Sequence, residues 1–123
     1  MSNSHDNNMF INLISDRPAN IAKALRFGRK FQGAGWKVFL SVNIDAVTLV
    51  KPGTDLGPCP VTGNSLVQML ADFHSEGGRV LVGKECLGQA GISPDQLPEG
   101  YEVAALPMTM EIMSLPDLKI ITW

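Results

Sequence analysis

The chain has 123 residues, of which 45% are hydrophobic and 18% are charged, and its formal net charge is −2. This length suits one domain with its own core, and this composition excludes a chain that is disordered throughout. The small net charge argues against a strongly basic nucleic-acid binder, and no apolar run reaches the ~20 residues of a membrane span. We therefore expect neither a nucleic-acid nor a membrane partner.

The N-terminal residues are polar and lack the apolar stretch of a signal peptide. We predict a disordered tail over residues 1–8 and a single α/β domain over residues 9–123. Two cysteines are too few for a disulfide scaffold in a domain of this size. These features predict a cytoplasmic protein with reduced thiols.

The first half of the domain predicts strands over residues 9–14 and 36–42 with a helix between them. Ser15 and Asp16 are candidate helix caps, and Pro18 suits the first turn. The helix has one apolar face and ends at glycines: Ile21, Ala24, Leu25, Gly28 and Phe31 form the face, and Gly33 and Gly35 the end.

The middle of the chain predicts a short helical turn over residues 46–50 and then a loop. Three prolines and three glycines in residues 51–63 favour that loop. Asn64 or Ser65 is expected to cap a second helix that ends at Gly77 and Gly78 and buries one face: Leu66, Met69, Leu70 and Phe73.

The second half alternates short strands with short helices. Strands are predicted over residues 79–82, 101–105 and 118–122, and helical pieces over residues 86–90, 94–97 and 107–114. Alternation of this kind predicts right-handed crossovers and a mostly parallel sheet covered on both faces. The expected fold class is α/β, a three-layer α/β/α domain with a mostly parallel five-stranded sheet.

Ligands of such sheets bind beyond the carboxyl ends of the strands. Those ends fall at residues 15–16, 43–45, 83–86 and 106–107, and Cys86 is the strong nucleophile among them. A helix N-terminus and Lys84 would favour its thiolate, Glu85 would oppose it, and Gly83 would allow close approach. Two interpretations stay open: a reachable reactive thiol, or a small buried hydrophobic side chain.

Cys59 lies between prolines in the predicted loop. It is a candidate second thiol that resolves a bond to Cys86, against a simpler interpretation as an incidental loop cysteine. His74, near a helix carboxyl end, favours a dipole interaction over catalysis, and His5 falls in the tail. The Met108, Met110 and Met113 cluster favours packing or a subunit interface over metal binding.

The basic side chains Lys23, Arg26, Arg29 and Lys30 form one face of the first helix, either solvated or a docking patch for an acidic partner. The sequence lacks Walker, GxGxxG, HExxH and GxSxG motifs and any zinc-ligand spacing. We therefore expect no cofactor and no metal.

Three segments carry a family resemblance. Gly83-Lys84-Glu85-Cys86 follows an apolar strand and precedes Gly91-Ile92, residues 42–49 follow the second strand, and residues 100–103 lead through a short helix to residues 118–122. Together they resemble the DsrE/DsrF-like sulfur-relay proteins, which share the YchN-like fold. The resemblance spans about residues 9–122.

The resemblance implies a homo-oligomer, a trimer or hexamer, in which Cys86 accepts sulfane sulfur as a persulfide and passes it to a partner thiol, for example that of a small sulfur-carrier protein. The chain would then be a sulfurtransferase or a sulfur carrier. Other members lack the cysteine and serve as assembly subunits, so a non-catalytic subunit or binding module is the alternative. A thiol redox sensor that uses Cys59 and Cys86 is a third hypothesis.

Overall fold

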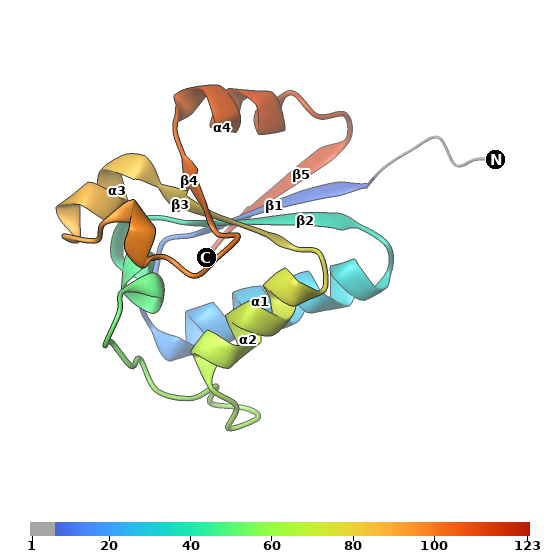
Figure 1. Ribbon diagram of the computed structural model, residues 1–123. Coiled ribbons are helices and arrows are strands. Elements are labelled where there is room, and N and C mark those ends of the chain that lie inside the picture. The colour runs from blue at the N-terminus through green and yellow to red at the C-terminus, as the bar shows by residue number, and fades with distance from the viewer. Residues whose placement is uncertain (1–6) are drawn as a thin grey trace.

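Five parallel strands form one sheet in the order β4–β3–β2–β1–β5, in a computed structural model that describes residues 7–123 (Figure 1). Every strand pairing is parallel. This confirms the predicted fold class. The strands are β1 (Asn8–Leu13), β2 (Lys37–Val42), β3 (Arg79–Gly83), β4 (Glu102–Ala104) and β5 (Leu118–Thr122).

Helices α1 (Pro18–Gly33) and α2 (Leu66–Ser75) cover one face of this sheet (Figure 1). They bury the larger core cluster, in which helix side chains such as Leu25 and Phe73 pack with the strand residues Ile11, Leu40 and Val80. Alternate strand residues point to one face, so these apolar positions recur at every second residue.

Helix α4 (Leu106–Met113) lies on the opposite face (Figure 1). The chain moves across the sheet in one direction from β1 to β4 and then returns to place β5 on the far side of β1. Because parallel crossovers are right-handed, reversing the direction of travel moves the connecting helix to the other face. A smaller cluster of Phe10, Phe39, Leu81, Ala104 and Ile112 is buried there.

The helix starts follow the predicted signals in one case and depart from them in the other. Ser65 caps α2, since its Oγ accepts a hydrogen bond from the N–H of Gln68. The N-cap of α1 is Arg17 with no side-chain cap, although Pro18 opens the helix as expected. Ser15 accepts a hydrogen bond from the N–H of Arg17 instead, so it orders the turn before the helix.

The carboxyl edge of the sheet carries the short elements. A 3-10 helix spans Ile44–Val50, α3 spans Lys84–Gln89, and a further 3-10 turn spans Pro94–Gln96. Residues 51–63 form the predicted loop, which is closed by an isolated bridge between Pro58 and Ser65.

The predicted tail lies mostly outside the described residues. Strand β1 begins at Asn8, one residue before the predicted start, because Asn8 pairs with both neighbouring strands and its side chain donates a hydrogen bond to the carbonyl of Pro116. Among residues 7–123, no helix is both long enough and apolar enough to cross a membrane.

Candidate functional site

Cys86 lies in the first turn of α3, directly beyond the end of β3. The helix begins at Lys84, two residues before the predicted start, and the Cys86 side chain is half-buried against the larger core. Since β2 and β3 are parallel neighbours, their carboxyl ends meet, and Cys86 lies beside the segment that follows β2. The sulfur is therefore at the edge of the sheet where parallel α/β proteins bind ligands.

The backbone of Ile44 supplies a polar contact to this sulfur. The Ile44 N–H donates a hydrogen bond to Cys86 Sγ at 3.2 Å. Ile44 has a positive φ of 55°, which is rare for a β-branched residue, and it is the first residue of the 3-10 helix. A hydrogen-bond donor of this kind interacts more strongly with an anionic sulfur than with a neutral thiol.

Asn43 precedes Ile44 and makes a polar network on the α4 side of the sheet. Its Nδ2 donates hydrogen bonds to Asn12 Oδ1 at 2.9 Å and to Ser41 Oγ at 2.8 Å. Asn12 and Ser41 are partners in the register of β1 and β2, and Ser41 is 5% exposed. The sequence pointed to residues 43–45 only because they follow the second predicted strand, and it did not predict this network. The feature that could have revealed the network is the polar residue within each of two otherwise apolar strands, Asn12 and Ser41.

A cavity of about 400 Å³ opens beside Cys86. Its volume falls in the range of small-molecule sites. Two charged side chains, Asp45 and Lys51, line it together with the thiol. The remaining lining residues are Ile44, Val47, Thr48, Thr54, Gln89 and Ala90. The cavity gives small molecules a path to the sulfur.

Gly83 and Lys84 lie next to Cys86 in different ways. A Cβ at Gly83 would collide with Asn43 Oδ1 and would lie 3.5 Å from Cys86 Sγ, so the glycine makes room for an asparagine side chain. Lys84 is exposed and does not line the cavity described above; Lys51 does. The sequence did not point to Lys51, because loop residues carry no periodic pattern that places them near a strand end.

Cys59 is in a different environment. It is 1% exposed and belongs to the larger core cluster, and its backbone bonds to Asn64 and Gly63 close the loop around it. Hydrogen bonds from the side chain and backbone of Thr62 hold the pKa of the Cys59 thiol below its usual value, against the opposing effect of burial. It does not line the Cys86 cavity, and both cysteines are free thiols. Its role as a second thiol stays a prediction.

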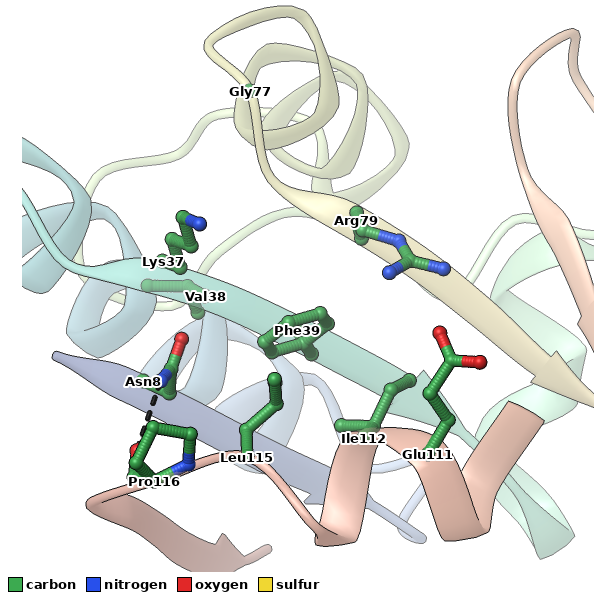
Figure 2. A pocket seen from close by; sticks show the side chains of 10 residues that line it. All are labelled: Asn8, Lys37, Val38, Phe39, Gly77, Arg79, Glu111, Ile112, Leu115 and Pro116. Atoms are coloured by element: carbon green, nitrogen blue, oxygen red, sulfur yellow. Dashed lines mark hydrogen bonds between the residues drawn. The ribbon is translucent and has the colours of Figure 1, made fainter. Parts of the chain in front are cut away.

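A larger cavity, of about 470 Å³, lies at the opposite edge of the sheet, between the strand starts and α4 (Figure 2). Figure 2 shows its apolar floor, which includes Phe39 and Ile112, and the charged side chains Lys37, Arg79 and Glu111 around it. Arg79 makes a bidentate ion pair with Glu102 and lies over the Phe39 ring. Because the described residues that line this cavity include no thiol or hydroxyl nucleophile, we place the candidate site at Cys86.

The histidines and methionines named from the sequence lie away from the Cys86 cavity or outside the described residues. His74 lies in the last turn of α2 and contacts the Tyr101 ring edge-on, with centroids 5.1 Å apart. Met108 packs on the smaller core, whereas Met110 and Met113 are 60% and 38% exposed. His5 lies outside the described residues. Over residues 7–123, no three His, Cys, Asp or Glu side chains gather in a way that could hold a metal ion.

The basic side chains of α1 lie along the face that the core does not use. Lys23 and Lys30 are exposed, while Arg26 and Arg29 are half-buried and line a shallow cavity with Met69 and Asp72 of α2. An acidic side chain thus already lies among these cations, which favours the solvated face over a dedicated docking patch.

Comparison with known proteins identifies the fold. No family model and no curated protein matches the chain. The ychN protein from E. coli is similar in structure, with a TM-score of 0.77, 20% identity and coverage of 97% of this chain and 100% of that one. MTH1491 from Methanobacterium thermoautotrophicum, a protein of unknown function, has a TM-score of 0.75, 11% identity and coverage of 96% and 100%. At these identities the likeness concerns the fold alone, and the chain has the YchN-like fold.

Proposed function

We propose that this protein is a sulfur-relay protein that carries sulfane sulfur as a persulfide on Cys86 and passes it to a partner thiol. The observation that carries the proposal is that Cys86 lines an open cavity while its sulfur accepts the Ile44 N–H at 3.2 Å. Access and a donor for negative charge are the two properties that a nucleophilic thiol needs. The resemblance of residues 83–92 to the sulfur-relay proteins supports the same assignment.

The reaction proceeds in two steps that need no oxidant. In the loading step, the Cys86 thiolate attacks the outer sulfur of a low-molecular-weight persulfide. A new S–S bond forms on Cys86, the S–S bond of the donor breaks, and its electron pair leaves with the donor thiolate. In the delivery step, a partner thiolate attacks the outer sulfur of the Cys86 persulfide, and Cys86 leaves as a thiolate.

The partner is a protein with an exposed cysteine, such as a small sulfur carrier. The cavity beside Cys86 is bounded by the 3-10 helix and α3, short surface elements that a second protein can approach. Neither step calls for a metal or an organic cofactor, because the electrons stay within the exchanging sulfur atoms.

Mass spectrometry of the intact protein tests the assignment. After incubation with glutathione persulfide, the wild type should gain the mass of one or more sulfur atoms, located by peptide mapping on Cys86. Cys86→Ser should gain none, and the matched control Cys59→Ser should load like the wild type. Equal loading of Cys86→Ser and wild type would refute the proposal.

A second candidate function, a non-catalytic subunit of an oligomer, is favoured by the outer side of α4. Leu106, Met110 and Ile120 are 69%, 60% and 55% exposed, and Ile120 lies on the sheet face that α4 covers only in part. Leu106 and Met110 are four residues apart and so lie on one side of α4, and exposed apolar side chains that gather in this way are typical of protein interfaces. We propose that copies of this chain assemble through this surface into a trimer or hexamer.

Sedimentation velocity tests the assembly. The wild type should sediment as a trimer or hexamer, and Met110→Glu should shift it toward the monomer because burying a carboxylate in the interface is unfavourable. Val61→Glu is a matched control, since Val61 is 68% exposed in the loop before α2. A monomeric wild type would exclude the assembly, while the loading experiment decides separately between a carrier and a passive subunit.

A further inference from the structure

We propose that Asn43 is a positioning residue for Cys86: it holds Ile44 in the conformation whose N–H reaches the sulfur. The inference rests on the sulfur-relay function proposed above, and it assigns to Asn43 control over how readily the sulfur leaves Cys86. It starts from a local conflict between the sequence and the backbone. Ile44 adopts a φ of 55°, where a β-branched side chain is strained by its own Cβ.

Burial of the Ile44 side chain does not account for that conformation. The side chain is 61% exposed, so an isoleucine at this position adds little to the core. Strained residues persist where the surroundings fix them, and they concentrate at functional sites. In this conformation the Ile44 N–H reaches Cys86 Sγ and donates a hydrogen bond to it.

The Asn43 side chain supplies the restraint. Its amide nitrogen donates hydrogen bonds to Asn12 on β1 and to Ser41 on β2, so the side chain is fixed to two strands at once. Its backbone N–H also donates to the carbonyl of Leu13 at 2.9 Å. These contacts fix the Cα of Asn43, and the Asn43 carbonyl accepts a hydrogen bond from the Ala46 N–H at 3.1 Å. Together they leave the Asn43–Ile44 peptide little freedom to turn the N–H away from the sulfur.

Gly83 completes the restraint from the other side. Its φ and ψ of −58° and 125° are available to any residue, so the backbone does not require glycine. What requires it is space, because a Cβ there would collide with Asn43 Oδ1. The glycine before α3 thus lets Asn43 and Cys86 share one corner of the site.

The chemical consequence differs between the two steps of the relay. During delivery, negative charge grows on Cys86 Sγ as it leaves, so a donor aimed at that atom accelerates the step. During loading, the charge on the sulfur decreases. A donor that stabilises the thiolate before it attacks gives the loading step no such acceleration. Loss of the positioned N–H should therefore slow delivery more than loading.

The experiment measures both rates with glutathione persulfide as donor and a cysteine-containing acceptor peptide. Asn43→Ala should slow delivery roughly three- to tenfold, the effect of one hydrogen bond to a developing charge, and should change loading less. Asn64→Ala, an exposed asparagine of the loop before α2, is the matched control and should change neither rate.

A rescue separates positioning from general damage. Glycine adopts a positive φ without strain, so Ile44→Gly should make the restraint unnecessary. Asn43→Ala should then reduce the delivery rate much less in the Ile44→Gly background than in the wild type. An undiminished cost in that background, or an Asn43→Ala variant that delivers at the wild-type rate, would overturn the inference.

Gly83→Ala keeps the test decisive if Asn43→Ala fails to fold. A methyl group at position 83 should displace Asn43 and slow delivery while loading persists, and wild-type delivery in this variant would overturn the inference as well. Failure of the wild type to load sulfur at all would instead refute the proposed function. The two ideas therefore fail on different measurements.

Discussion

The two cysteines of this chain lie in regions that differ in access to the sulfur and in the hydrogen bonds that it receives. Cys59 is enclosed by the loop before α2, and hydrogen bonds from Thr62 lower the pKa of its thiol. Cys86 is half-buried at the carboxyl edge of the sheet, beside a cavity and a backbone donor. The first region combines a lowered thiol pKa with an enclosed sulfur, and the second combines an accessible sulfur with a hydrogen-bond donor.

Ionisation alone therefore does not identify a reactive cysteine. The thiolate is the nucleophile, but the reagent that it attacks must also reach the sulfur with the breaking bond in line. The lowered pKa of the Cys59 thiol alone would point to that residue, whereas access to the sulfur favours Cys86. Labelling and unfolding measurements can test that choice directly.

Alkylation of the native protein should separate the two cysteines most clearly. Iodoacetamide should modify Cys86 faster than Cys59 by a factor on the order of a hundred, because Cys59 reacts only after its loop opens. Peptide mapping during a time course measures both rates, and labelling in urea, where both thiols are exposed, is the control. Faster labelling of Cys59 in the native protein would reverse the assignment.

A core substitution near Cys59 should reduce the difference in labelling rate between the two cysteines, because it loosens the surroundings of Cys59 alone. Leu66, the first residue of α2, is 1% exposed and directly follows Ser65, which forms a bridge with Pro58 beside Cys59. Leu66→Ala should lower the free energy of unfolding by about 2–5 kcal/mol, measured by urea denaturation, and should speed the labelling of Cys59 more than that of Cys86.

Ile112→Ala is the matched control for that experiment, since Ile112 is buried in the separate cluster under α4. It should destabilise the protein without a selective increase in labelling at Cys59. Equal acceleration of both cysteines in Leu66→Ala would mean that labelling follows global unfolding, and the proposed local enclosure of Cys59 would be wrong.

Among these predictions, the smallest effect on the free energy of unfolding is expected from the ion pair that joins β3 to β4. Arg79 lies 2.7 Å from Glu102, with side chains 42% and 33% exposed, and hydrogen bonding to Arg79 lowers the pKa of Glu102. Because the pKa of Glu102 is lower in the folded protein than in the unfolded chain, the ion pair stabilises the fold at pH values above the unfolded pKa. This stabilisation is lost as the pH falls through the pKa of the folded protein.

Glu102→Gln should therefore lower the free energy of unfolding by at most about 1 kcal/mol at neutral pH, because solvent screens a pair this exposed. The difference from the wild type should shrink in acid as Glu102 becomes protonated. Denaturant titrations at several pH values measure it. A difference that grows in acid would contradict the assigned cause.

Much of the fold could be predicted because the spacing of apolar residues along the sequence indicates which side chains are buried. The apolar strands, the Ser65 cap and the proline-rich loop all leave local signals, and the structure confirms them. The cap of α1 was predicted wrongly, since a serine two residues before Arg17 can equally accept a hydrogen bond within a turn.

The candidate site could be predicted only in part. Cys86 was found from its place after a strand, but its surroundings include three residues from other parts of the chain: Ile44, Asn43 and Lys51. The positive φ of Ile44 could not be predicted, because isoleucine disfavours that conformation and local preference argues against it. Tertiary contacts decide the backbone there, and they have no local signal in the sequence.

The left-handed backbone at position 44 also bears on how this protein would respond to selection for heat resistance. A glycine there would relieve a conformational penalty larger than the entropy it adds to the unfolded chain, for a net stabilisation of about 1 kcal/mol. Laboratory evolution toward a higher melting temperature should therefore reach this position early. If the protein delivers sulfur as proposed, that step in the evolved chain should no longer depend on the Asn43 side chain.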